Sequence, residues 1–245
     1  MAYRRLLSDL RTAVRDNLDE ATASFWTNAQ LNRFLTRAAD AVWMECRKLK
    51  ADFFLLQRTS TDGSVTIYGD SYTTSSFAIV AGTTDYTLPM DLAELRRIDA
   101  TTSGYESVVF RHADLATSTM RAYRAQTTNQ DPTVIWFDVI GERTLTIAPK
   151  CSVALDLRLW YVPRTMIFST AGASLMDFAT DTDELALPHP LYLAVEEMAT
   201  MRAQLMDRDP SATNWEQMAE RTVRRFFGAH ARQSQDPEVV EGVFE

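Results

Sequence analysis

The sequence is poor in the residues from which most catalytic and metal sites are built. Its 245 residues include three histidines, eight glycines and only two cysteines, Cys46 and Cys151. The cysteines lie far apart and form no CxxC pair, so neither a disulfide framework nor a zinc site is expected. The chain also lacks any run of about 18 uncharged apolar residues, so no membrane span is expected. No glycine-rich phosphate loop is present.

Positive charge is also scarce, with 25 basic against 33 acidic side chains and a net charge of −8. A protein that wraps nucleic acid needs a concentrated basic surface, which this composition does not favour. The composition is compatible with a channel along which DNA slides without being bound. The deficit lies in the middle of the chain, since residues 61–190 hold nine basic and sixteen acidic side chains. Residues 1–60, in contrast, carry a net charge of +3.

Apolar residues recur at helical spacing near both ends of the chain. One stripe runs through residues 3–18 and a longer one through residues 28–50. Helical spacing returns after Leu187, and Asp209-Pro210 separates two further helices there. Four helices are therefore predicted, two from each end of the chain.

The second helix has a recognisable start. Thr27 can cap its first turn, and Gln30 stands three residues later, as in a capping box. Trp26 and Leu31 occupy the two positions of a hydrophobic staple. These signals place the first helical residue at about Asn28.

Between the helical ends the pattern changes to short alternating runs that are typical of strands. The clearest are residues 64–68, 133–139, 144–148 and 153–162. The sequence therefore predicts an α+β fold. Residues 1–57 and 188–233 form a helical bundle, residues 58–187 form an inserted antiparallel β-rich domain, and residues 234–245 form an extended C-terminal tail. An ordinary α+β domain without functional meaning in this layout is the alternative.

Gly69-Asp70-Ser71 is the strongest resemblance to an enzyme site. It follows a predicted strand, as the nucleophile does in GDS-type serine esterases, which makes an esterase using Ser71 the alternative function. Such a serine needs a histidine to accept its proton. None of the three histidines, His112, His189 and His230, has an aspartate three residues before it, as the DxxH element of those esterases requires. A turn between strands is the simpler interpretation, and we predict that the protein is not an enzyme.

Asp177, Asp181, Asp183 and Glu184 form a small acidic cluster before the third helix. A calcium loop needs a glycine at its sixth position and a closing glutamate at its twelfth, and neither is present when counting from Asp181. We therefore predict a solvated loop and no metal site. No cofactor is implied by any motif.

Two segments near the C-terminus are candidates for docking a partner protein. Arg221, Arg224 and Arg225 cluster on the last predicted helix, where a salt-bridged solvated face and a docking or DNA-facing patch are both compatible with the spacing. Beyond it, glutamates surround four apolar residues, Val239, Val240, Val243 and Phe244. This tail is either a frayed terminus or a peptide that adds to a partner surface.

Several short blocks along the chain, taken in order, resemble a known protein family. They are Phe25–Leu35, with the pattern W-[ST]-x-x-x-L-x-x-x-[LI], then Asp85–Pro89, Leu145–Pro149, Leu157–Pro163 and Asp183–Pro188. In these blocks the chain resembles the head-to-tail adaptor (connector) proteins of tailed bacteriophages, including the tail tubular protein A type. The likeness spans residues 3–230.

This resemblance implies a structural virion protein of the phage neck or tail, assembled in the host cytoplasm. It implies twelve copies in a ring that binds the portal protein on one side and a tail or nozzle protein on the other. Double-stranded DNA would pass through the ring without specific binding, and no membrane would be involved. Another minor head-completion or tail protein is the alternative within the virion.

Overall fold

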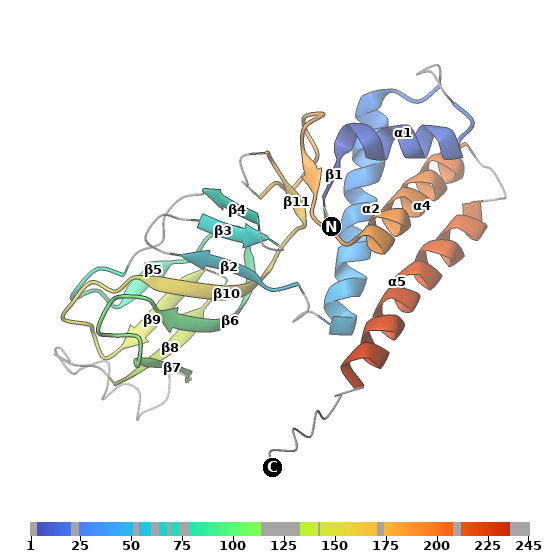
Figure 1. Ribbon diagram of the computed structural model, residues 1–245. Helices are drawn as coiled ribbons and strands as arrows, with labels where there is room; N and C mark the ends of the chain where they lie inside the picture. Colours follow the sequence, from blue (N-terminus) through green and yellow to red (C-terminus); the bar gives the residue numbers. More distant parts are fainter. Residues whose placement is uncertain are drawn as a thin grey trace, which may run out of the picture. The chain divides into compact units, whose positions relative to one another are not determined.

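The two ends of the chain fold together, and the segment between them forms a sheet (Figure 1). The computed structural model describes residues 4–20, 25–50, 54–59, 64–67, 70–73, 79–113, 133–141, 143–170, 174–207 and 212–235. The helical unit comprises Met1–Lys50 and Met176–Glu245, and the sheet unit comprises Ala51–Leu175. The predicted α+β class is confirmed, because terminal helices pack together and a mainly antiparallel sheet domain is inserted between them in sequence.

The helical unit contains α1 (Leu7–Asn17), α2 (Asn28–Lys50), α4 (His189–Met206) and α5 (Ala212–Gln235). Both α1 and α5 contact α2 and α4, and Figure 1 shows α4 between α1 and α5. The core of the unit is apolar and contains fully buried side chains from three helices, among them Leu10, Leu35, Trp43 and Val195. None of the described helices has the length and apolarity of a membrane-crossing segment.

The first helix begins later than its apolar stripe suggests. Arg5 and Leu6 form a short strand, β1 (Arg5–Leu6), which pairs antiparallel with β12 (Glu184–Leu185). The N–H of Leu7 then donates to the carbonyl oxygen of Asp183 at 2.8 Å. Backbone groups at residues 5–7 therefore bond to a distant segment, and helical hydrogen bonding starts only at Leu7.

The start of α2 agrees with the sequence prediction. The backbone N–H of Thr27 donates to Gln30 Oε1 at 2.9 Å, and the N–H of Gln30 donates back to Thr27 Oγ1 at 3.3 Å. These reciprocal bonds satisfy donors that the first turn of a helix leaves unpaired. Trp26 packs edge-on against Phe34 with ring centroids 5.4 Å apart, and Leu31 is fully buried. The capping box is confirmed.

The sheet unit contains a nine-stranded sheet in the order β4-β3-β2-β10-β6-β7-β8-β9-β5. All neighbours pair antiparallel except β7 and β8, which are parallel. The short strand β11 (Ile167–Phe168) follows β10 in the chain. The strands of the large sheet are β2 (Leu56–Thr59), β3 (Ser64–Ile67), β4 (Asp70–Thr73), β5 (Asp85–Thr87), β6 (Leu92–Ala100), β7 (Val109–His112), β8 (Val134–Ile140), β9 (Thr144–Ala148) and β10 (Leu157–Pro163).

Strand β10 organises the centre of this sheet, because it pairs with both β2 and β6. Its alternate residues Leu157, Leu159 and Tyr161 are buried. The hydroxyl of Tyr161 donates to Asp91 Oδ2 at 2.6 Å, so the buried phenol has a polar partner. The long alternating run in the sequence thus corresponds to a central strand.

Candidate interaction surfaces

The esterase-like serine lies within a strand of the sheet. Ser71 belongs to β4, which forms an antiparallel hairpin with β3. His112 lies on β7 with its Nε2 3.6 Å from Asp138 Oδ1. His189 begins α4, and its ring packs edge-on against Tyr192. The imidazole of His112 therefore contacts Asp138, and that of His189 contacts Tyr192. The side chain of His230 lies outside the described residues.

The acidic cluster before α4 holds the N-terminal segment in place. Arg11 pairs with Asp181 at 2.6 Å, and Arg4 pairs with Glu184 at 3.1 Å. Asp183 accepts two backbone N–H bonds, at 2.6 and 2.7 Å, from within its own turn. Among the described residues no group of His, Cys, Asp and Glu has the arrangement of a metal site. The carboxylates of Asp181 and Glu184 therefore join the two ends of the chain, whereas that of Asp183 holds its own turn.

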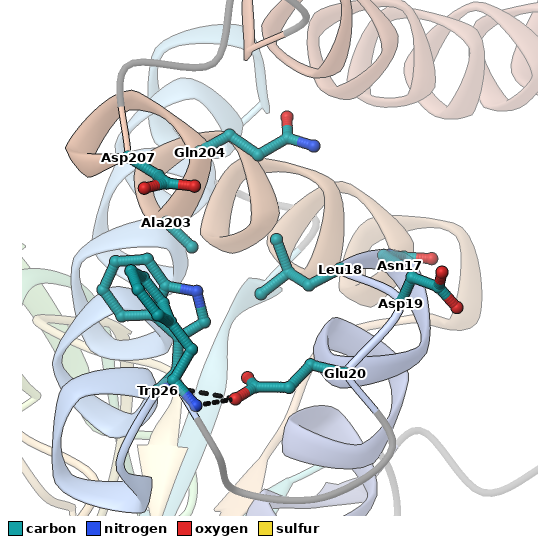
Figure 2. A pocket seen from close by; sticks show the side chains of 9 residues that line it. Asn17, Leu18, Asp19, Glu20, Trp26, Ala203, Gln204 and Asp207 are labelled. Carbon is teal, nitrogen blue, oxygen red and sulfur yellow. Dashed lines mark hydrogen bonds between the residues drawn. The ribbon is translucent and has the colours of Figure 1, made fainter.

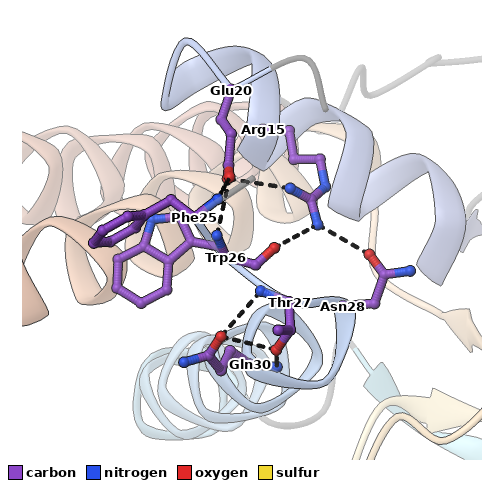
Figure 3. A network of polar contacts seen from close by, with 7 residues as sticks. All are labelled: Arg15, Glu20, Phe25, Trp26, Thr27, Asn28 and Gln30. Atoms are coloured by element: carbon purple, nitrogen blue, oxygen red, sulfur yellow. Dashed lines mark hydrogen bonds and ion pairs between the residues drawn. The ribbon is translucent and has the colours of Figure 1, made fainter. Parts of the chain in front are cut away.

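A largely buried polar network joins the end of α1 to the start of α2 (Figure 3). The guanidinium of Arg15 donates to Glu20 Oε2 at 3.1 Å, to the carbonyl oxygen of Trp26 at 2.8 Å and to Asn28 Oδ1 at 3.0 Å. The other carboxylate oxygen of Glu20 accepts the backbone N–H groups of Phe25 and Trp26. Sequence pattern did not reveal this network, because its members share no recognisable spacing.

The network presents an aromatic side chain at the surface. Phe25 is 63% exposed although its backbone N–H is bound by Glu20. Its ring meets Trp26 edge-on with centroids 4.9 Å apart. Beside it lies a pocket of ≈ 480 Å³ between the end of α1 and the last turn of α4, where Figure 2 shows Trp26, Asp19 and Asp207. The exposed ring of Phe25 therefore lies beside two exposed carboxylates, those of Asp19 and Asp207.

A second hollow lies among α2, α4 and α5. It has a volume of ≈ 670 Å³, and at its edge Met44 and Leu49 are about half exposed. Its other lining residues are Ala41, Val42, Glu45, Met198, Ala219, Glu220, Val223 and Arg224. We refer to this hollow as the α2–α5 groove. Its lining is mostly apolar, which is typical of a surface that receives an apolar group.

The predicted arginine cluster lies on the exposed side of α5. Arg221, Arg224 and Arg225 are exposed, whereas Val223 and Phe226 between and beyond them are buried. Arg224 lies 3.9 Å from Glu220, one helical turn earlier. Such an exposed pair contributes little to stability, so the charges of this face are available to a partner. Val239, Val240, Val243 and Phe244 of the predicted tail lie outside the described residues.

One carboxylate of the helical unit is buried. Glu196 on α4 is 5% exposed, and its Oε1 lies 3.2 Å from the guanidinium of Arg5, which stacks over the ring of Tyr192. Burial raises the pKa of Glu196 to about 7, and the positive charge of Arg5 opposes part of this rise. This ion pair joins β1 to α4 within the helical unit.

Comparison with known proteins identifies the family. The family model described as SU10 adaptor protein matches residues 5–241, which is nearly the whole chain. No curated protein matches significantly. The chain therefore belongs to the SU10 adaptor protein family, a family of phage head-tail adaptors. The predicted resemblance to phage adaptors is confirmed, as is the prediction that the protein is not an enzyme.

Proposed function

We propose that this phage adaptor forms a ring between the portal and the tail and continues the DNA channel. The observation that carries the proposal is the adaptor family match over residues 5–241. Twelve copies are proposed for the ring, the number that the resemblance to phage connectors implies. The portal protein binds one side of the ring, and a tail or nozzle protein binds the other.

The charge distribution supports passage of DNA without binding. Residues 61–190 carry nine basic and sixteen acidic side chains, a net charge of −7. A channel wall of the same sign as the phosphate backbone repels DNA and forms few of the salt-dependent contacts that retard sliding. Asp177, Asp181, Asp183 and Glu184 of this stretch belong to the helical unit, and the sheet unit Ala51–Leu175 holds ten basic and thirteen acidic side chains, a net charge of −3. Both units can therefore supply negative charge to the wall of the channel.

The C-terminus supports docking on a partner. The last helix ends at Gln235, and ten residues follow it in the sequence. Val239, Val240, Val243 and Phe244 supply apolar side chains that can enter pockets of the portal when the tail adds to its surface. Arg221, Arg224 and Arg225 supply positive charge for a second partner contact.

The test is to mix the purified chain with purified portal rings and image the product by electron microscopy. We expect a closed ring on one face of the portal, coaxial with its channel. Portal rings alone are the control. If the chain forms no ring on its portal, the adaptor-ring proposal is wrong, and a different head-completion or tail role has to be considered.

A further inference from the structure

The pocket beside Phe25 carries negative charge, and none of its described lining residues is cationic. Its charged lining residues are Asp19, Glu20 and Asp207. Arg15 neutralises Glu20, whereas Asp19 and Asp207 are exposed and have no ion-pair partner within the described part of the chain. Figure 2 shows these two carboxylates on opposite sides of the hollow. The pocket therefore presents two uncompensated negative charges.

The ring of Phe25 gives the same pocket a second feature that attracts a cation. The ring is 63% exposed, and Glu20 holds its position by accepting the backbone N–H groups of Phe25 and Trp26. The face of an aromatic ring is electron-rich and attracts guanidinium groups. A guanidinium can stack on the ring while its N–H groups donate to a carboxylate. The pocket is therefore suited to an arginine side chain.

Exposed arginines are present on α5 of the same protein. Arg221, Arg224 and Arg225 lie within five residues of one another. Of the three, only Arg224 is ion-paired within the described part of the chain, to Glu220 at 3.9 Å. Arg221 and Arg225 are four residues apart and thus lie on one face of the helix. Two cations one turn apart match the two carboxylates of the pocket in number and are opposite in sign.

The arginines of α5 lie far from the pocket of their own chain. Arg224 lines the α2–α5 groove together with Ala41 and later residues of α2. Phe25, in contrast, precedes Asn28, the first residue of α2. At 1.5 Å of rise per residue, the stretch from Asn28 to Ala41 spans roughly 20 Å. This separation exceeds the length of an arginine side chain, so the cation has to come from another molecule.

We propose that Arg221 and Arg225 of one copy dock into the pocket beside Phe25 of the next copy. The inference rests on the proposed ring, because identical copies that join through two different surfaces close into a ring when the rotation permits. It names the neighbouring copy as the second partner of the α5 arginines. Opposite local charges orient the two surfaces even though each chain carries a net charge of −8.

Reversing the charges one at a time and then together tests this contact. The variants are Asp207→Arg, Arg225→Glu and the chain that carries both. Asp207 is the C-cap of α4, where a cation is favourable, and glutamate is a good helix former, so both variants should keep the circular dichroism spectrum of the wild type. The readout is the concentration of chain at which half of the portal rings carry an adaptor ring in electron micrographs.

We expect each single reversal to raise this concentration roughly tenfold or more, because it places like charges opposite each other. The double reversal restores an opposite pair and should return the concentration to within roughly threefold of the wild type. Phe25→Leu keeps an apolar side chain but removes the aromatic face, and should raise the concentration by roughly 2–5-fold. A double reversal that binds as weakly as the single ones would overturn the inference.

The matched controls are Asp177→Arg and Arg33→Glu, which change the net charge by the same amounts. Both residues are exposed in the helical unit and lie outside the two surfaces. Each control should stay within about twofold of the wild type, as is typical of exposed positions away from a contact. Equal weakening by controls and test variants would overturn the inference, as would weakening by Arg33→Glu in place of Arg225→Glu, which would assign the contact to α2.

The same measurement separates this inference from the proposed function. If the wild type forms a ring on its portal and both single reversals form it equally well, the inference is wrong and the proposed function stands. If Asp207→Arg weakens ring formation and Arg225→Glu does not, the pocket receives a cation of another protein and the inference is overturned. If the wild type forms no ring, the proposed function fails, and the neighbouring copy is excluded with it.

Discussion

Replacing Arg15 with methionine should destabilise the helical unit substantially. Arg15 is 8% exposed and donates three hydrogen bonds of 2.8–3.1 Å that methionine cannot make. The substitution leaves the carboxylate of Glu20, which is also largely buried, without its cationic partner. Removing one partner of a buried ion pair costs about 3–5 kcal/mol. Because Glu20 retains the N–H donors of Phe25 and Trp26, we expect the lower end, ~3 kcal/mol.

Urea denaturation monitored by tryptophan fluorescence measures this loss in the free energy of unfolding. A thermal scan should show a fall in Tm of roughly 6–12 °C. Arg33→Met on the exposed side of α2 is the matched control and should change the free energy of unfolding by less than ~0.5 kcal/mol. Combining Arg15→Met with Glu20→Gln should cost less than the sum of the two single changes. A loss below ~1 kcal/mol for Arg15→Met would refute the argument that the network fixes the connection.

Three further predictions follow from the helical unit. Thr27→Ala removes half of the capping box and should lower the free energy of unfolding by ~1 kcal/mol in urea titrations, and an unchanged value would contradict the cap. The pKa of Glu196 is about 7 in the folded protein against 4.5 for the free side chain, so the folded state holds this proton more tightly. As the pH rises between those two values, the contribution of Glu196 to the free energy of unfolding therefore falls by up to ~3 kcal/mol. Glu196→Gln should remove this fall when urea midpoints at pH 5 and pH 8 are compared, and a persisting fall would assign it to other groups. Deleting residues 236–245 should lower the fraction of the chain that sediments with portal rings, while the circular dichroism spectrum of the monomer stays that of a helical protein. An equal fraction for the deleted and the full chain would contradict a docking tail.

Local patterns in the sequence predicted the elements but not their partners. The start of α2 was predictable, because Thr27 and Gln30 are near neighbours whose bonds need only a helical turn. The late start of α1 was not, since it depends on pairing between Arg5 and Leu185, which are distant in the sequence. The same holds for the sheet, where alternation predicted β10 but could not place it between β2 and β6.

The candidate surfaces were likewise only partly predictable from the sequence. Helical spacing was enough to place Arg221, Arg224 and Arg225 close together on α5, where the structure finds them exposed. The network around Phe25 could not be predicted, because it depends on a turn at Asp19, whose φ of 54° lies in the left-handed region. Aspartate enters that region more readily than most residues, yet nothing in its sequence neighbourhood marks this one.

The most direct test of the adaptor account is a helix-resolving electron microscopy map of the chain bound to its portal. We predict a closed ring of copies that is coaxial with the portal channel. Binding of isolated copies, or no binding to the portal, would contradict the account.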